Sequence, residues 1–254
     1  MRSEQNFEAS PNLTGHKFKP LSEQLLKSLE ASEIYFASPA QLNDPFDCQI
    51  DLRLARALAL SSLGGSTSSA EDELWGFISA ILAERLKTCG VFSLCGGEVI
   101  GPNSHLFWPH YGDNHEGVCL TYSIPESFVI EQQIGVGPVN YTPDSLYKAL
   151  VGLKLSAVSS NDEMQETIIS LLTTKSKAWS YEDEFRLVSY IPGPQKIPKE
   201  WLKQVCFGLR VGEAERQCLM ESLHKWGYAH CTFAEVLKAD DQLFGFALNE
   251  LFLE

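Results

Sequence analysis

The sequence predicts an α+β protein with mixed, mostly antiparallel strands surrounded by helices, folded as a single compact domain. Stretches with strand and helix patterns follow one another at irregular intervals, and no Gly-rich turn recurs in the strand–helix–strand order of a doubly wound fold. Of the 254 residues, 44% are hydrophobic and 21% charged, which excludes a fully disordered chain. We expect residues 1–12 to form a flexible tail and residues 13–254 to form the domain.

The first elements follow from local patterns. Residues 15–19 are expected to form a short strand, which Pro20 ends. Residues 21–29 are expected to form a helix because their leucines recur on one face, with Ser22 as the N-cap. Residues 34–38 are rich in aromatic and β-branched side chains and predict a second strand.

The remaining elements are predicted from the same two periodicities and from turn residues. The Ser/Gly-rich stretch 61–70 predicts a loop. Helices are expected at residues 74–87, within 145–174 as one or two helices broken near 159–161, and at 212–226, where Gly227 follows as the C′ residue. Strands are expected at residues 91–95, 118–122, 185–190, 204–207 and 230–237.

The charge balance excludes some classes of protein. There are 33 acidic and 20 basic residues, giving a net charge of −13, which disfavours a nonspecific nucleic-acid binder. No run of ~18 apolar residues occurs, so no membrane span is expected, and residues 1–11 lack the apolar core of a signal peptide. We expect a cytoplasmic protein, with secretion as an effector left open. The seven cysteines indicate buried free thiols in a reducing compartment.

The densest polar-aromatic stretch runs over residues 107–117 and leads into a predicted strand. Aromatic and polar side chains packed this closely suit the lip of a pocket, with Trp108, His110 and Tyr111 as binding residues. An ordered loop with a half-buried Trp is an equally good interpretation.

The histidines at 105, 110 and 115 suggest a metal site, but a spacing of five places them on one face of neither a helix nor a strand. Asp113 and Cys95 would complete such a site only if the fold delivered them. A metal-dependent hydrolase using His105, His110 and Asp113 is therefore an alternative, and no metal is expected.

A second candidate lies in residues 179–188. On a strand, Glu182, Glu184 and Arg186 would share one face. That face is either a solvated surface or a cleft in which one Glu accepts a ligand hydroxyl and Arg186 holds a neighbouring carboxylate. Two close carboxylates raise each other's pKa, which suits acid–base chemistry.

Two further segments have two interpretations each. Residues 43–47, Asn-Asp-Pro-Phe-Asp, predict a turn whose Asx side chains bond nearby backbone, or a wall of the same cleft with Asp44 or Asp47 facing it. Lys17, between His16 and Lys19, lies on a surface strand or faces an anionic ligand.

Together these segments resemble an uncharacterised bacterial family, the domain of unknown function 2971. The matching stretches are residues 16–20, 34–39, 43–47, 107–117 and 177–187, and residues 205–208 with the following helix fit the C-terminal end of the family. The Asn-Asp-Pro-Phe-Asp and Trp-x-His-Tyr elements are the most specific. Membership supplies no activity.

A weaker resemblance, to ADP-ribosyltransferases, implies one. These enzymes carry a first-strand residue that grips NAD, a second strand with an aromatic residue and Ser or Thr, and a late strand with the catalytic Glu. The resemblance implies a split, two-sheet core in which Lys17, or else His16, grips NAD. It places Tyr35, Phe36 and Ser38 on the second strand, and it makes Glu184 the catalytic residue of a Glu-x-Glu pair with Glu182.

The chemistry that this resemblance implies is cleavage of the nicotinamide glycosidic bond through an oxocarbenium-like centre. Glu184 would stabilise the positive charge of that centre. Tyr35 or Phe36 would stack on nicotinamide, and Lys17 or Arg186 would meet the pyrophosphate.

The sequence thus predicts one cleft for a small nucleotide-like ligand. The candidate ligand-binding residues are Lys17, Tyr35, Phe36, Ser38, Asn43, Asp44, Asp47, Trp108, His110, Tyr111 and Arg186. With Glu184 and Glu182 as catalytic residues, the protein would be an ADP-ribosyltransferase-like toxin, effector or phage-defence protein, with NAD as substrate and an unidentified macromolecular acceptor. The alternative is a non-catalytic ligand- or partner-binding module of a bacterial defence or regulatory system.

Overall fold

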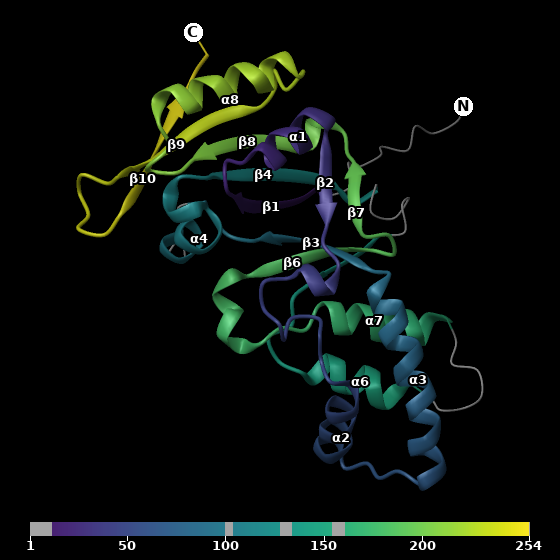
Figure 1. The fold of residues 1–254 in the computed structure, drawn as a ribbon. Helices are drawn as coiled ribbons and strands as arrows, with labels where there is room; N and C mark the ends of the chain where they lie inside the picture. The colour runs from purple at the N-terminus through teal and green to yellow at the C-terminus, as the bar shows by residue number, and fades with distance from the viewer. Residues whose placement is uncertain (1–11, 100–103, 128–133, 154–160, 254) are drawn as a thin grey trace, which may run out of the picture. The chain divides into compact units, whose positions relative to one another are not determined.

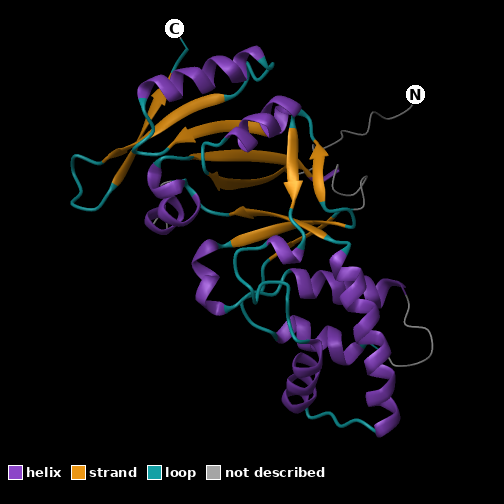
Figure 2. Cartoon of the chain, in the orientation of Figure 1, coloured by secondary structure: helices purple, strands orange, loops and turns teal. Residues whose placement is uncertain are grey.

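The computed structural model describes residues 12–99, 104–127, 134–153 and 161–253. These residues form two compact units. Unit 1 takes its residues from Met1–Ser32, Gly96–Ile134 and Ile197–Glu254, and unit 2 from Glu33–Cys95 and Gly135–Lys196. Each unit contains both helices and strands (Figure 2), so the predicted α+β class is confirmed.

Unit 1 is built on five strands in the order β10-β9-β8-β4-β1 (Figure 1). The strands are β1 (Asn12–Lys19), β4 (Val118–Pro125), β8 (Leu202–Phe207), β9 (Thr232–Lys238) and β10 (Phe246–Leu251). The β8–β9 pair is parallel, as expected for strands joined through a helix, and the other pairs are antiparallel. The described helices include α1 (Glu23–Ala31), α4 (Ser104–Tyr111) and α8 (Glu213–Lys225), with the 3₁₀ turns η2 (Asp113–His115) and η4 (Lys199–Trp201).

The predicted capping residues of unit 1 are confirmed. The Ser22 side chain accepts a hydrogen bond of 3.3 Å from the Leu25 amide at the start of α1. Leu25 and Leu29 are buried on the apolar face of that helix. After α8, Gly227 takes a left-handed φ of 91°, a conformation that glycine adopts at little cost.

Unit 2 contains a three-stranded antiparallel sheet and a two-stranded one. The first has the order β3-β6-β5, formed by β3 (Gly90–Cys95), β6 (Glu184–Ser189) and β5 (Gly135–Pro138). The second pairs β2 (Glu33–Phe36) with β7 (Gly193–Lys196). The described residues of this unit form four α-helices (Figure 1): α2 (Leu52–Leu63), α3 (Ser69–Lys87), α6 (Asp144–Gly152) and α7 (Asn161–Leu172). The 3₁₀ turns are η1 (Pro39–Gln41) and η3 (Lys177–Glu182).

The core of unit 2 forms where the apolar faces of these helices meet the sheet. Its most deeply buried side chains include Leu82, Leu146, Leu150, Ile168, Leu171 and Val188. All seven cysteines of the chain are free thiols, and five of them are buried, as predicted. Among the described residues, no helix combines the length and the apolar character needed to cross a membrane.

Two predicted loops differ from the structure. The loop predicted at 61–70 is shorter in the structure, because α2 continues to Leu63 and α3 begins at Ser69. The Ser68 side chain caps the start of α3. The stretch from Phe107, interpreted as a loop, instead contains the end of α4, with Pro109 inside the helix. Packing explains this helix, since the ring of Phe18 stacks on Phe107 at 5.2 Å and meets Trp108 edge-on at 5.0 Å.

Some expectations stay predictions. Residues 1–11 of the predicted tail, and residues 159–160 of the predicted helix break, lie outside the described residues. Asn12, the last residue of the predicted tail, begins β1. The division of the chain into a tail and one domain stays a prediction, as does an ADP-ribosyltransferase-like core.

Candidate functional site

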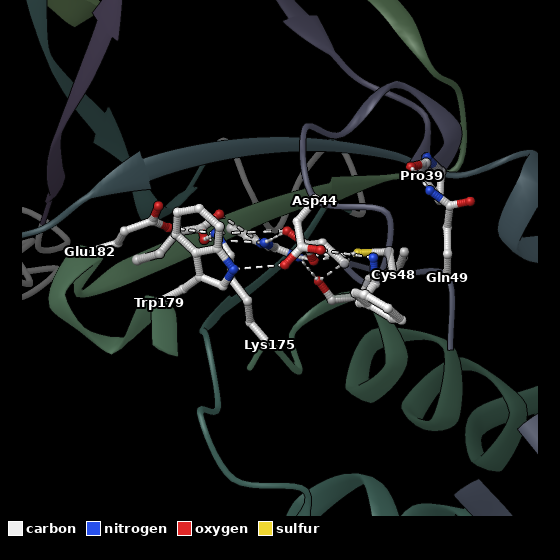
Figure 3. A network of polar contacts seen from close by, with 12 residues as sticks. Pro39, Asp44, Cys48, Gln49, Lys175, Trp179 and Glu182 are labelled. Atoms are coloured by element: carbon white, nitrogen blue, oxygen red, sulfur yellow. Dashed lines mark hydrogen bonds and ion pairs between the residues drawn. The ribbon is translucent and has the colours of Figure 1, made fainter. Parts of the chain in front are cut away.

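Five charged side chains come together inside unit 2 (Figure 3), and none is more than 8% exposed. We call this group the buried charge cluster. It contains Asp47, Lys175, Glu182, Glu184 and Arg186. Asp47 comes from the loop after η1, Lys175 from the segment after α7, Glu182 from the end of η3, and the other two from β6.

Arg186 is the centre of the cluster. Its Nη1 and Nη2 donate parallel hydrogen bonds of 2.8 and 2.6 Å to the two carboxylate oxygens of Asp47. Its Nε and Nη2 donate to the two oxygens of Glu184, at 2.8 and 3.1 Å. Nη1 also donates to the Leu172 carbonyl at 2.7 Å. The planar guanidinium matches such paired oxygens, so one side chain fixes two carboxylates.

Lys175 joins the two glutamates. Its Nζ donates hydrogen bonds of 2.5 Å to Glu182 and 3.0 Å to Glu184, and it lies 3.7 Å from Asp47. Burial by itself would lower the pKa of Lys175, but the charges of Glu184 and Glu182 outweigh it and raise the pKa above its ordinary value. Lys175 is therefore an ammonium ion and not a nucleophilic amine.

Glu184 is an ionised carboxylate. Burial by itself would raise its pKa, but the charges and hydrogen bonds of Arg186 and Lys175 outweigh burial and lower the pKa to about 2. The expectation that the two glutamates raise each other's pKa is therefore wrong for Glu184, because Lys175 lies between them and Arg186 pairs with Glu184. The interpretation of this face as a solvated surface is also wrong, since Glu182, Glu184 and Arg186 are at most 4% exposed.

The cluster contains more acidic than basic side chains. It has three carboxyl groups, on Asp47, Glu182 and Glu184, and two basic groups, on Lys175 and Arg186. The Cys48 thiol lies 3.1 Å from Arg186 Nη1, and burial raises the pKa of Cys48, so the thiol adds no charge. Buried charges are costly unless they are paired, and the extra carboxyl group is a possible partner for a cationic group that reaches the cluster.

Three partly exposed aromatic side chains lie beside the cluster: Tyr141, Trp179 and Tyr181, which we call the aromatic rim. The Trp179 ring centroid lies 5.1 Å from Lys175 Nζ and 6.0 Å from the Tyr181 ring. The Tyr141 hydroxyl accepts a 2.9 Å hydrogen bond from the Glu184 amide. Burial raises the pKa of Tyr141 to about 12, so its hydroxyl is neutral.

Asp44 connects the aromatic rim and the Asn-Asp-Pro-Phe-Asp turn by hydrogen bonds (Figure 3). Its Oδ1 accepts a 2.9 Å hydrogen bond from the Phe46 amide, which is the predicted Asx turn. Its Oδ2 accepts a 2.7 Å hydrogen bond from the Trp179 indole. The structure thus joins the turn to η3 through Asp44 and Trp179. The interpretation of the turn as the wall of a cleft stays a prediction. Asn43 lies in the turn as an exposed residue.

The register of the charged segment differs from the predicted one at one position. Glu184 and Arg186 lie on β6 and both contact Asp47 or Lys175. Glu182 ends η3 instead of sharing the strand, because Asp183 between them takes a left-handed conformation with a φ of 44°.

The predicted second-strand residues lie in and after β2. Phe36 is buried, whereas Tyr35 is 41% exposed. The Tyr35 and Ser38 hydroxyls both contact the Gln41 side chain, at 3.0–3.3 Å and 3.0 Å, and so hold the turn η1. In unit 2, the Tyr35 and Ser38 side chains therefore stabilise the turn η1.

The other candidates belong to unit 1. Lys17 lies on β1 opposite Leu120, and the neighbouring His16 contacts Thr121 and the Gly97 carbonyl at 3.0 and 2.9 Å. Lys17 belongs to unit 1 and Glu184 to unit 2. That the two side chains lie close together stays a prediction.

Trp108 is fully buried in unit 1, so the interpretation of a half-buried Trp is wrong. His110 and Tyr111 end α4, with ring centroids 6.2 Å apart. His105 contacts the Phe244 carbonyl at 2.9 Å and the Phe246 ring at 4.4 Å. In the part of the chain that the structure describes, no group of three or more His, Cys, Asp or Glu side chains is placed to hold a metal ion.

Sequence reasoning missed Lys175, Cys48 and Tyr141. Cys48 and Tyr141 have distant partners, with Arg186 138 positions from Cys48 and Glu184 43 positions from Tyr141. Lys175 lies only seven and nine positions from Glu182 and Glu184, but it stands before the candidate segment and outside the strand pattern. Trp179 belongs to the candidate segment, but the sequence could not show that its indole donates a hydrogen bond to Asp44, 135 positions away.

Comparison with known proteins gives one match, to a family model over part of the chain. No curated protein and no solved structure matches the chain. One family model matches over residues 107–187, about a third of the chain, and this segment carries Lys175, Trp179, Glu182, Glu184 and Arg186. The predicted resemblance is therefore confirmed over these residues, which match the family described as Protein of unknown function (DUF2971). The predicted matching stretches outside residues 107–187 stay predictions.

Proposed function

We propose that the chain binds a small nucleotide-like ligand with a cationic ring at the aromatic rim of unit 2, with NAD as the ligand, and that it does so without turning the ligand over. The observation that carries this proposal is the excess of carboxyl over basic side chains in the buried charge cluster, which lies beside partly exposed aromatic side chains. Aromatic faces stack on flat rings, and negative charge favours the positively charged nicotinamide ring of NAD over a neutral one.

The hydrogen bonds that the two glutamates already accept from Arg186 and Lys175 favour binding over catalysis. A carboxylate that stabilises a reacting ribose must contact it. Both oxygens of Glu184 accept hydrogen bonds from Arg186, one of them also from Lys175, and the side chain is 3% exposed. The module would therefore sense its ligand or present it to a partner, in a defence or regulatory system.

ADP-ribosyl transfer is the second candidate, and one observation favours it. Glu184 stays ionised because its pKa is lowered to about 2. A fixed negative charge stabilises an oxocarbenium-like centre, and removing such a group costs ~10²–10³ in rate.

Calorimetric titration of the full chain with NAD, NADH and ADP-ribose tests the proposal. NADH has a neutral dihydronicotinamide ring and ADP-ribose has none, so we expect NAD to bind at least ~10-fold more tightly than either. Trp179→Ala should weaken NAD binding, whereas Tyr190→Ala, which removes a partly exposed aromatic side chain outside the rim, should not.

A nicotinamide-release assay with cell lysate separates the two candidates. Binding without release supports the sensor. Release that Glu184→Gln abolishes, with the variant still folded by circular dichroism, would establish the transferase instead. Failure of NAD to bind, or equal affinity for NADH, would overturn the proposed ligand.

A further inference from the structure

Unit 1 contains a cavity of about 340 Å³ that the site in unit 2 does not use. Its described lining residues come from β8, α8, the segment before β9, β9, and β10 with the residues after it. Ligand pockets span ~300–1,000 Å³, so this cavity has room for one small molecule and not for a dinucleotide.

The charge of the lining has one sign. Glu250 is the one carboxylate among the described lining residues, and these include neither Lys nor Arg. The other polar side chains there include those of Gln204 and His224. An anionic ligand would therefore meet a like charge, and a cationic ligand would meet an opposite one.

These polar side chains are not used by the fold. No hydrogen bond or ion pair joins the side chains of Glu250, Gln204 or His224 to another described residue. Thr232, by contrast, donates to the Lys203 carbonyl at 3.2 Å. Glu250 thus keeps its capacity to accept hydrogen bonds from a ligand.

The rest of the lining is mainly apolar. Phe233 and Leu251 are cross-strand partners on β9 and β10, and Ala229 and Phe252 add further apolar surface. Apolar walls with one charged group are the composition of a site that binds an amphipathic small molecule.

We propose that this cavity binds a small organic amine, with its ammonium group on Glu250 and its apolar body against Phe233 and Leu251. An ammonium–carboxylate contact is a charge-assisted hydrogen bond, about twice as strong as a neutral one. For a ligand of this size the expected Kd lies near ~0.1–1 mM. This site is independent of the proposed NAD site.

Titration of the full chain with phenethylamine tests the proposal, with 2-phenylethanol and 3-phenylpropanoate as neutral and anionic analogues. The amine should bind, the alcohol should bind at least ~10-fold more weakly and the carboxylate should not bind. Glu250→Gln should weaken amine binding at least ~10-fold and leave stability unchanged, because Glu250 is exposed and holds no partner. Glu200→Gln, an exposed glutamate outside the cavity, should bind as the unaltered chain does.

In the titrations, three results would overturn the proposal: no saturable binding at roughly 10 mM amine, equal affinity for the alcohol, or unchanged affinity in Glu250→Gln. Chemical-shift changes on amine addition should be centred on Ala229 to Phe233. Changes confined to unit 2 would place the amine elsewhere and contradict the assignment.

Discussion

The guanidinium of Arg186 and the carboxylate of Asp47 form two parallel hydrogen bonds of 2.8 and 2.6 Å across 139 positions of the chain. Arg186 also binds the Leu172 carbonyl, which ends α7. One side chain therefore connects the Asn-Asp-Pro-Phe-Asp turn, β6 and the end of α7 inside unit 2.

Replacing Arg186 should destabilise the protein strongly. Arg186→Met leaves Asp47 and Glu184 buried without their main partner, and breaking such a pair costs ~3–5 kcal/mol. Arg186→Lys should recover only part of this loss, because an ammonium group cannot form both parallel pairs. Urea unfolding measures the change, and Arg53→Met, at an exposed position of α2, should stay within ~0.5 kcal/mol. A loss of less than ~0.5 kcal/mol in the free energy of unfolding for Arg186→Met would show that the cluster contributes little to stability.

Stability should fall in acid because of Glu184. Its pKa is about 2 in the folded protein against an ordinary 4.5, so its ionised form stabilises the fold above pH 4.5. This contribution, on the order of 3 kcal/mol, is lost as the pH falls from 4.5 toward 2. Urea unfolding at several pH values in this window should give a steeper slope for the unaltered chain than for Glu184→Gln. Parallel slopes would contradict the lowered pKa.

Asp44 should govern the environment of Trp179. Asp44→Ala removes both the Asx turn and the indole acceptor, at a cost of ~1–2 kcal/mol, and should shift Trp179 fluorescence to longer wavelength. Asp44→Asn keeps a side-chain oxygen and should retain most of both. Asp241→Ala, at an exposed position, serves as the control. An unchanged emission spectrum in Asp44→Ala would exclude this contact in solution.

Gly117 and Gly208 should not tolerate a side chain. A Cβ on Gly117 would lie 2.3 Å from the Lys19 carbonyl oxygen, and one on Gly208 would lie 2.3 Å from that of His115. Either change to Ala forces backbone to move, and we expect ~2 kcal/mol or more of destabilisation in thermal unfolding. Gly76→Ala meets nothing within 4 Å inside α3 and should instead stabilise by ~0.5–1 kcal/mol. Equal effects at the three positions would contradict this argument.

Local chemistry made much of the fold predictable. Period-2 and period-3.6 patterns located most helices and strands, and capping residues such as Ser22 and Gly227 marked helix ends. The loop prediction at Phe107 was wrong. Pro109 and the clustered polar residues are typical of a loop, whereas contacts with Phe18 stabilise a helix there. Tertiary packing of this kind has no local signal.

The site was predictable in part. Strand alternation brought Glu184 and Arg186 to one face, but it could not show that both are buried or that Lys175 lies between the glutamates. Because a pKa depends on such neighbours, the sign of the Glu184 shift could not follow from sequence.

The two units are interleaved along the chain. The polypeptide passes between them after Ser32, Cys95, Ile134 and Lys196. No single cut of the chain can therefore release either unit intact, and a fragment limited to the matched residues 107–187 would lack Asp47, β2 and β3. Isolation of unit 2 as an autonomous domain would need residues 33–95 and 135–196 to be joined by an engineered linker.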